Sequence, residues 1–412
     1  MRPASLVRCS TSLATFCAAL ILAPFAAAQT SPIQGTNPET APAAPAAAAY
    51  VPTSLVAEPG LPRTPDGHPD LQNVVWHSNY FGMIEAVPMM LPPELVLSEE
   101  KAKATFDKMI AMFFGTPAAK AALETDPEAS ELLTKADGFP VVRGQRRSRF
   151  VVLPADGKIP YTAEARREAA GAMNRTRKSD NPEERGSSER CVAMGGQAPI
   201  AMTNPFAPRQ FIQTPGHMVI NIEWGDEARI IPFAASHGPA ALRPWMGDAI
   251  ARWDGDTLVI ETTGFSAKDR IRGAMPTSLI LNPDSKVIER YTRVSKDELL
   301  YQFTIEDPKL YTAPWLAEYS LFRVGYRMYP SSCHEGNYSL SNILSGQRVA
   351  DVQRVEAFRP SDADGDGKLS KAEYAVLLKT LGFASQLETL FPQRDLNKDG
   401  FVSADEYRNP LP

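Results

Sequence analysis

The sequence has few cysteines, few histidines and no excess of positive charge. Four cysteines and five histidines occur in 412 residues, and 48 aspartates and glutamates outnumber 43 lysines and arginines, for a net charge of -5. Nucleic-acid-binding domains usually carry a basic patch and a high isoelectric point. We therefore expect no nucleic-acid partner for this chain.

Long apolar runs are also scarce. Beyond the first thirty residues no stretch approaches the roughly 18 consecutive apolar residues that a membrane span needs, so we expect no transmembrane segment in the mature protein. The first thirty residues have a basic start, an apolar run from Leu13 to Phe25, and Ala26 and Ala28 at the two positions that a signal peptidase reads. This pattern predicts a signal peptide over residues 1–28 and an exported protein, periplasmic or secreted.

Residues 29–60 consist largely of alanine, proline, threonine and serine. Such a segment has too little apolar surface to offset the entropy of ordering. We expect a disordered linker here, followed by a main domain over 61–350 and a small C-terminal domain over 351–412.

Export changes how the cysteines are interpreted. Cys9 and Cys17 leave with the signal peptide, so the mature chain keeps only Cys191 and Cys333. In an oxidising compartment two remaining cysteines predict one disulfide. Two buried thiols are the alternative.

No catalytic motif with specific spacing is present. The chain contains neither a Gly-x-Ser-x-Gly elbow nor a helical His-Glu-x-x-His pair. His334 and Glu335 adjoin Cys333, and we interpret this cluster as a disulfide flank and turn. We assign no catalytic residues. A site assembled from distant residues leaves no local trace, so an enzyme stays open as an alternative.

The middle of the chain alternates apolar and polar residues with a period of two. Met218, Ile220 and Ile222 share one face of a predicted strand, as do Tyr301 and Phe303 of a later one, and turn formers separate the runs at hairpin spacing. We predict about eight antiparallel strands, each buried on one face, in an up-and-down barrel or a strongly curved meander. A sandwich is the alternative.

Helices are expected ahead of the strands. Ser98 followed by two glutamates predicts one helix start, and Asp126 followed by Pro127 predicts another. The fold class is therefore α+β, with a β-rich main domain that begins in helices.

Several charged residues lie on the predicted strands, where they would line or flank a pocket for a small or envelope ligand. Strand charges that face solvent are the other interpretation. These residues are Arg252, Glu261, Glu289, Arg290 and Arg293.

The C-terminal residues contain two twelve-residue loops with oxygen ligands at the spacing that calcium requires. Positions 1, 3, 5, 7, 9 and 12 of such a loop supply ligands, the seventh through its backbone carbonyl and the ninth often through water, and position 6 is glycine. In the first loop these are Asp362, Asp364, Asp366, Lys368, Ser370 and Glu373, with Gly367 at the turn. In the second they are Asp395, Asn397, Asp399, Phe401, Ser403 and Glu406, with Gly400. We predict two Ca²⁺ sites.

The loops also fit a paired module. Leu369 and Val402 fall at the eighth positions, where a short strand contact can join the loops, and apolar residues at helical spacing flank both loops. The pattern resembles the EF-hand superfamily. Pro360 interrupts the first entering helix and the last helix has room for at most a turn or so.

Three further segments resemble an uncharacterised family of exported bacterial proteins over roughly residues 61–349. These segments are Arg63 to Gln72, Trp253 to Leu258 and Cys333 to Tyr338. The resemblance implies secretion and a shared fold, and no reaction.

Together these features predict an exported calcium-binding protein with a β-rich domain that binds a small or envelope ligand. Calcium is plentiful outside the cytoplasm, so we expect the loops to stay loaded and to serve as a structural or docking module. The alternative is an exported hydrolase-type enzyme with a calcium-stabilised appendage.

Overall fold

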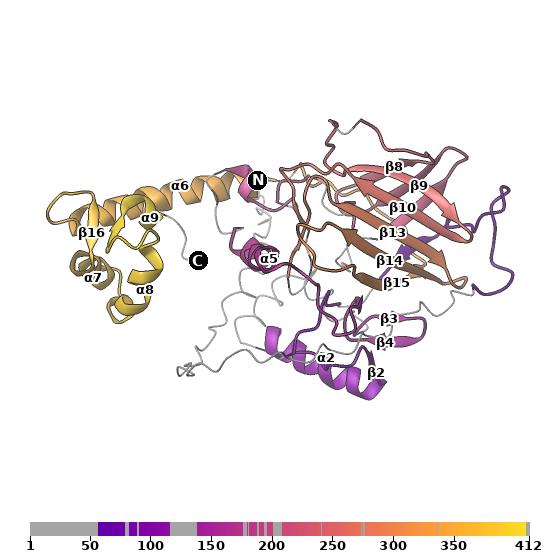
Figure 1. Ribbon diagram of the computed structural model, residues 1–412, viewed down its shortest axis with the longest axis horizontal. Coiled ribbons are helices and arrows are strands. Elements are labelled where there is room, and N and C mark those ends of the chain that lie inside the picture. The colour runs from indigo at the N-terminus through magenta and orange to yellow at the C-terminus, as the bar shows by residue number, and fades with distance from the viewer. Residues whose placement is uncertain are drawn as a thin grey trace, which may run out of the picture. The chain divides into compact units, whose positions relative to one another are not determined.

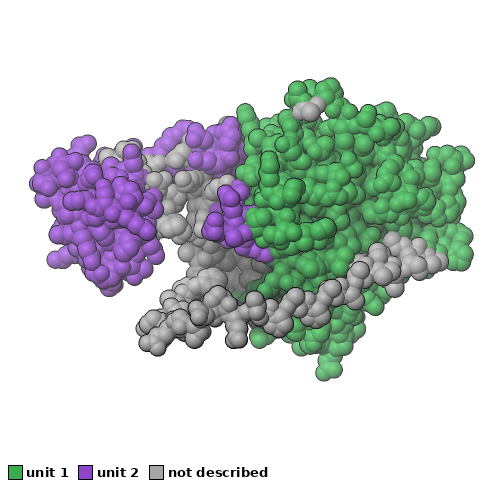
Figure 2. All heavy atoms as spheres, in the orientation of Figure 1, with its two compact units in different colours: residues 1–162, 195–331 green, residues 163–194, 332–412 purple. Residues whose placement is uncertain are grey.

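The computed structural model describes residues 57–78, 82–88, 90–115, 138–175, 179, 181–187, 189–192, 196–200, 208–239, 241–272, 274, 277–335 and 337–408. The predicted signal peptide, the linker up to residue 56 and the helix predicted to begin at Asp126 lie outside these residues. The chain forms two units, coloured separately in Figure 2. Unit 1 holds Met1–Thr162 and Gly195–Ser331, and unit 2 holds Ala163–Met194 and Ser332–Pro412.

Unit 1 is built on one large antiparallel sheet, as the period of two predicts. Its strands run in the order β8-β7-β6-β1-β15-β14-β13-β10-β9, with β5 paired to β15, and Figure 1 shows β10, β13, β14 and β15 in succession. The strands are β1 (Val75–His77), β5 (Val151–Leu153), β6 (Arg209–Gln213), β7 (His217–Ile222), β8 (Glu227–Pro232), β9 (Asp248–Asp254), β10 (Thr257–Thr263), β13 (Lys286–Arg293), β14 (Glu298–Glu306) and β15 (Leu316–Val324).

The sheet is strongly curled but does not close into a barrel. Arg229 of β8 forms an ion pair with Glu289 of β13 at 2.6 Å, although these strands stand six places apart in the sheet. Neighbouring strands lie about 4.8 Å apart, so the two side chains meet only because the sheet curls around a common interior. Among the described residues a single isolated bridge, Phe233 to Ala251, joins the segment after β8 to β9. The prediction of a curved meander is therefore confirmed, and the sheet is not a closed barrel.

The central strands are buried on both faces, which differs from the prediction of one buried face. Tyr301 and Phe303 of β14 face the interior, as expected, but Leu300 and Gln302 of the same strand are buried as well. On that second face Gln302 donates to Glu318 of β15 at 2.9 Å, and Arg147 lies 3.5 Å from the same carboxylate. The segment ahead of the main strands covers this face, and its contribution could not be seen from the strand pattern.

That segment holds a small sheet and a helix. The sheet order is β2 (Val96–Leu97), β4 (Gln145–Arg147), β3 (Val141–Val142). Helix α2 (Glu99–Phe114) begins where predicted, because Ser98 accepts a hydrogen bond from the Lys101 amide at 3.2 Å. The sequence therefore located this helix start correctly. A short pair, β11 (Ile271–Arg272) and β12 (Leu279–Ile280), completes the described strands of the unit.

Two of the family-like segments lie against each other in unit 1. The guanidinium of Arg63 donates to both carboxylate oxygens of Asp256 at 2.8 and 2.6 Å. The His68 ring stacks on Trp253 with 4.5 Å between centroids. These contacts fasten the turn-rich segment to the hairpin between β9 and β10.

Unit 2 contains α5 (Ala163–Arg175), a 3-10 turn η1 (Pro182–Glu184) and the long helix α6 (Tyr338–Phe358). The C-terminal elements, which lie together in Figure 1, are η2 (Arg359–Ser361), β16 (Lys368–Ser370), α7 (Lys371–Thr380), η3 (Ala384–Gln386), α8 (Leu387–Arg394), β17 (Phe401–Ser403) and α9 (Ala404–Arg408). Helix α6 runs continuously across residue 350, and the boundary drawn there stays a prediction. No helix in the described part of the chain combines the length and apolarity of a membrane span.

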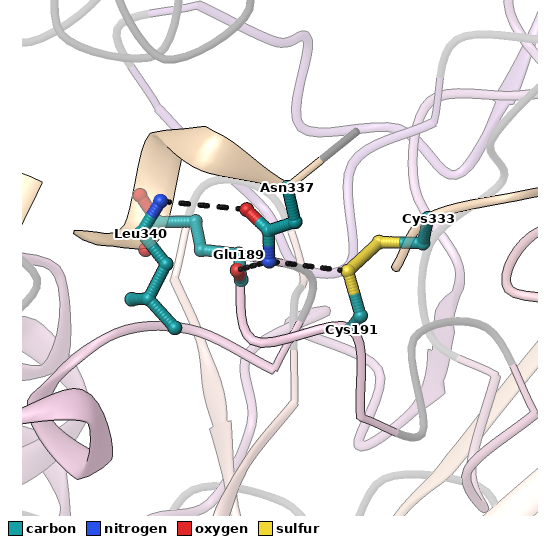
Figure 3. The surroundings of a disulfide bond; sticks show 5 residues. All are labelled: Glu189, Cys191, Cys333, Asn337 and Leu340. Atoms are coloured by element: carbon teal, nitrogen blue, oxygen red, sulfur yellow. Dashed lines mark hydrogen bonds between the residues drawn. A yellow bond between two sulfur atoms is a disulfide. The ribbon is translucent and has the colours of Figure 1, made fainter. Parts of the chain in front are cut away.

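Cys191 and Cys333 form the predicted disulfide at the start of α6 (Figure 3), with their Cα atoms 5.7 Å apart. Asn337 explains the motif that follows the second cysteine. Its side-chain amide donates to the Glu189 carbonyl at 2.8 Å and to the Cys191 sulfur at 3.3 Å, and its oxygen accepts from the Leu340 amide at 3.4 Å. The prediction that the residues after Cys333 form a turn beside a disulfide is confirmed.

Candidate calcium sites

The two loops of unit 2 rest on a small apolar core. Residues from α6, α7, α8 and α9 and from both short strands are buried together: Phe358, Leu369, Tyr374, Leu377, Leu378, Phe391, Val402 and Tyr407. Leu369 lies opposite Val402 in the antiparallel pair of β16 and β17. The eighth positions therefore join the loops as predicted. Pro360 lies in η2, where α6 changes to a 3-10 turn.

The first loop folds around the carboxylate of Asp362. Its Oδ1 accepts from the Gly365 amide at 2.8 Å and its Oδ2 from the Gly367 amide at 3.0 Å. Gly367 has φ of 81°, a left-handed conformation in which other residues are strained. The loop thus makes its sharp turn at the predicted glycine.

Glu373 closes the first loop from the opposite end. It enters at the first turn of α7, where Ser370 caps the helix and Glu373 bonds back to the Ser370 amide at 2.9 Å. Its other oxygen accepts from the Ala363 amide at 2.9 Å. One ligand atom each from Asp362, Asp364 and Glu373 lies within 4.8 Å of the others, a spacing that can hold a metal ion.

The second loop is also built around its first and twelfth residues, although its first carboxylate bonds the fifth loop residue where that of the first loop bonds the fourth. Asp395 Oδ1 accepts from the Asp399 amide at 3.0 Å and Oδ2 from the Gly400 amide at 3.0 Å. Glu406 accepts from the Asn397 amide at 3.1 Å and the Ser403 amide at 2.8 Å. Arg394 donates to the Glu406 carbonyl at 3.4 Å and the Tyr407 carbonyl at 2.9 Å, which anchors the short α9.

A lysine of the first loop reaches the second. Lys368 Nζ lies 2.9 Å from Asp399 Oδ2, the fifth-position carboxylate of the other loop. This hydrogen bond raises the pKa of Lys368 and lowers that of Asp399. The sequence predicted only a backbone carbonyl ligand from Lys368, and the side-chain contact was missed because it joins residues 31 apart.

The closing glutamates are prepared to stay ionised. Hydrogen bonds from the Ser370 hydroxyl and amide lower the pKa of Glu373. Burial alone would raise the pKa of Glu406, but hydrogen bonds from Ser403, Asn397 and Leu396 together hold that pKa below its ordinary value. Ionised carboxylates, carbonyls and hydroxyl-held water are the hard oxygen ligands that Ca²⁺ prefers. The donor set and the turns of both loops fit this ion. The role of each ligand stays a prediction.

The strand charges singled out from the sequence do not form one pocket. Glu289 is fully buried inside the curled sheet, whereas Arg290 pairs with Asp254 at the surface at 2.9 Å, and Arg252 is exposed. Arg293 donates to backbone carbonyls of 295 and 296 and lies over the Trp76 ring. Glu289 and Arg293 are therefore buried, whereas the other three are partly or fully exposed.

Glu261 belongs to a partly exposed cluster around His237. The two ring nitrogens of His237 lie 3.2 Å from Asp248 and 3.2 Å from Glu261. A general base needs a free nitrogen within reach of the proton it takes. With a carboxylate on each nitrogen, His237 is better placed to fasten the β8–β9 connection to β9 and β10 than to catalyse.

Two interior arginines were missed from the sequence. Arg209 and Arg229 are almost completely buried. The alternation of the strands could have predicted their burial, because residues two apart on a strand share a face. Arg209 lies two residues before buried Phe211, and Arg229 lies two residues before buried Ile231. An arginine in the inward phase of a strand marks a charged interior.

Comparison with known proteins gives matches at the C-terminal end. The EF hand family matches residues 355–378 and 387–411. Polcalcin Ole e 3 of Olea europaea is 38% identical over 63 residues, 15% of this chain and 73% of its own length, and polcalcin Nic t 2 of Nicotiana tabacum is 38% identical over 63 residues, 15% and 71%. Calcium-binding protein 7 of Rattus norvegicus is 32% identical over 83 residues, 18% of this chain and 39% of its own length. The match thus spans about two fifths of that relative. No solved structure matches the chain.

Proposed function

We propose that this chain, which belongs to the EF-hand family through its C-terminal residues, is an exported protein whose two loops remain loaded with calcium. The loaded pair serves as a structural clip or docking module. The observation that supports the proposal is the pairing of the two loops through Leu369 and Val402, with Glu373 and Glu406 folded back onto the ends of their loops.

The charge of the loops supports a stabilising role for the ion. Asp362, Asp364 and Glu373 place three carboxylates within reach of one metal ion. Like charges at this spacing repel one another, and a divalent cation replaces that repulsion with attraction. Calcium binding and folding of this region are therefore coupled.

Permanent loading follows from the proposed compartment. Extracellular calcium modules have dissociation constants of roughly 0.1 to 1 mM, far weaker than those of cytosolic sensors. Where free calcium exceeds such a value the sites stay filled. An ion present at a hundred times its dissociation constant adds about 2.7 kcal/mol to the free energy of unfolding.

Urea unfolding of the mature protein with calcium and with a chelator tests the clip. We expect the chelator to lower the midpoint for unit 2. The double variant Glu373→Gln, Glu406→Gln should show the lower midpoint in both conditions, while Glu388→Gln, which removes an exposed carboxylate outside the loops, should behave as the wild type. An unchanged midpoint in the wild type would contradict the clip.

Export is tested by fractionation and N-terminal sequencing of the protein from its own host. Recovery outside the cytoplasm with Gln29 as the first residue is expected. A protein that retains its first 28 residues and stays in the cytoplasm would overturn both export and permanent loading, because cytosolic calcium is too dilute to fill weak sites.

The curled sheet of unit 1 is proposed to bind a small ligand. Support comes from the charged interior, where Arg229, Glu289 and Arg209 are buried together with tyrosine hydroxyls. Purely structural cores seldom contain so many buried charges. The enzyme alternative has weaker support, since the two carboxylates on His237 leave it no free nitrogen.

A further inference from the structure

The interior of the curled sheet contains a charged cluster of six residues from strands β6, β8, β13, β14 and β15. We call it the interior cluster: Arg209, Arg229, Glu289, Tyr291, Tyr301 and Tyr319, each at most 4% exposed. Its charges are two guanidinium groups and one carboxylate. The formal sum is one uncompensated positive charge.

Glu289 forms an ion pair with Arg229. The two side chains form a bidentate pair, with Nη1 to Oε1 at 3.1 Å and Nη2 to Oε2 at 2.6 Å. The same carboxylate accepts from the hydroxyls of Tyr301 at 2.8 Å and Tyr291 at 3.4 Å. Its acceptor capacity is used, so it does not neutralise Arg209.

Within the described part of the chain, Arg209 has one weak hydrogen bond. Its Nη2 donates to the Tyr319 hydroxyl at 3.4 Å, and its guanidinium carbon lies 6.0 Å from the centre of the Tyr301 ring. Its Nε and Nη1 atoms are buried and have no acceptor among the residues that the structure describes. A guanidinium always carries its charge, and leaving it buried without a partner is strongly destabilising.

The other buried carboxylates of unit 1 bond elsewhere within the described residues. Glu85 accepts from the Ile159 amide, Asp269 lies beside Arg272, Asp307 accepts from Ser285, and Glu318 accepts from Gln302. None of these four is bonded to Arg209.

The surrounding tyrosines do not supply the missing negative charge. Burial, followed by the nearby Glu289, raises the pKa of Tyr291 and of Tyr301 well above the ordinary value, and burial raises that of Tyr319. All three hydroxyls stay neutral at any physiological pH. Tyr319 already donates to the Ile200 carbonyl at 2.9 Å.

We propose that Arg209 anchors a small monoanion inside the curled sheet, a monocarboxylate whose oxygens accept from its free Nε and Nη1 groups. This inference rests on the proposed ligand binding by unit 1 and names the ligand's chemistry. An apolar remainder of the ligand would suit the neighbourhood, because Phe211 and Tyr291 pack ring against ring there, with 5.2 Å between centroids. A carboxylate and an inorganic anion share the charge that Arg209 requires.

Residues 196–200 lie against the same cluster. The Ile200 amide donates to the Tyr301 hydroxyl at 3.0 Å, and Ile200 also accepts from Tyr319. Ala198 and Ile200 are buried. A ligand paired with Arg209 would therefore stabilise this segment together with the strands.

The test is thermal unfolding of the full-length, calcium-loaded protein after unfolding, dialysis and refolding to remove retained molecules. The probes are sodium acetate, butyrate, octanoate and benzoate, the matching neutral amides, and sodium chloride, bicarbonate and phosphate, at constant ionic strength. We expect at least one carboxylate to raise Tm saturably, by about 5 °C at a hundred times its Kd, and its amide to have no effect. A full effect from an inorganic ion would assign the occupant to that ion and still support the monoanion.

Arg209→Met supplies the decisive variant, because methionine fills the space without a charge. It should abolish the Tm response, whereas Arg290→Met, which removes a surface guanidinium, should retain it. Native mass spectrometry of wild-type protein from its own host provides a second readout that does not depend on the variant folding, and an anionic adduct lost on denaturation is expected. No anion response in the wild type and no adduct would mean that buried water alone satisfies Arg209, and the proposal would be wrong. A neutral adduct in place of an anionic one would contradict the monoanion but still support ligand binding by unit 1, so the two proposals fail separately.

Discussion

The calcium loops and the interior cluster are both charged sites, but they are assembled in opposite ways. Each calcium loop draws its ligands from twelve consecutive residues. In the interior cluster Arg229 and Glu289 are 60 residues apart, and Arg209 and Tyr319 are 110 residues apart. A site of the first kind has a readable spacing, whereas a site of the second kind exists only once the sheet has curled.

The two sites also differ in their exposure to water. Most loop ligands are exposed or half-exposed, so solvent screens their charges. The interior cluster is buried, so solvent screens its charges little, and the Arg229–Glu289 pair depends on both of its members. Substitutions in the interior should therefore cost more stability than substitutions around the loops.

Arg229→Met should have the largest effect among these variants. It leaves the Glu289 carboxylate buried without a cation, and breaking such a pair costs about 3 to 5 kcal/mol. The free energy of urea unfolding measures this loss. The double variant Arg229→Met, Glu289→Met removes both charges and should recover most of the stability. Equal stability of the wild type and the single variant would contradict the claim that substitutions in the interior cost more stability than substitutions around the loops.

Removal of the disulfide should have the next largest effect. Replacing Cys191 and Cys333 with serine releases a loop of 142 residues, and disulfides typically contribute about 2 to 4 kcal/mol. Urea unfolding under non-reducing conditions should show the loss. Adding reductant should destabilise the wild type but not the variant, and equal sensitivity of both to reductant would be inconsistent with a bond between these residues.

Lys368→Gln should have a smaller effect and the opposite sign. The lysine neutralises Asp399, so its removal frees a carboxylate for calcium in the second loop. An ion pair this exposed is screened by solvent and contributes little, so we expect only a small rise in calcium affinity. Calorimetry of this variant beside Lys379→Gln, a lysine at the far end of α7, measures it. Unchanged affinity would show that the contact does not couple the loops.

The smallest expected effect is a pH dependence in unit 1. The hydrogen bond from Arg63 lowers the pKa of Asp256, so folding favours its ionised form. Its contribution is complete above the unfolded pKa of about 3.9 and is lost as the pH falls through the lower folded value. Wild type should be slightly more stable than Asp256→Asn at pH 6, and the difference should vanish in strong acid. A difference that grows on acidification would have the wrong sign.

The sequence predicted features built from residues close together in the chain better than features built from distant residues. The calcium loops, their strand contact and the Ser98 helix start were predicted because each depends on residues close together in the chain. The antiparallel strands followed from alternation. Arg209 and Arg229 were missed because strand alternation indicates which side chains are buried but not which groups they contact. The contact of Lys368 was missed because it joins one loop to the other. Burial of Gln302 depends on a covering segment that no strand pattern reveals.

The central claim is that the two loops bind calcium, and calorimetric titration of the mature protein tests it most directly. The wild type should bind two calcium ions with measurable heat, and Glu373→Gln, Glu406→Gln should bind neither with comparable affinity. Equal heats from the two proteins would contradict the assignment of these loops as the calcium sites.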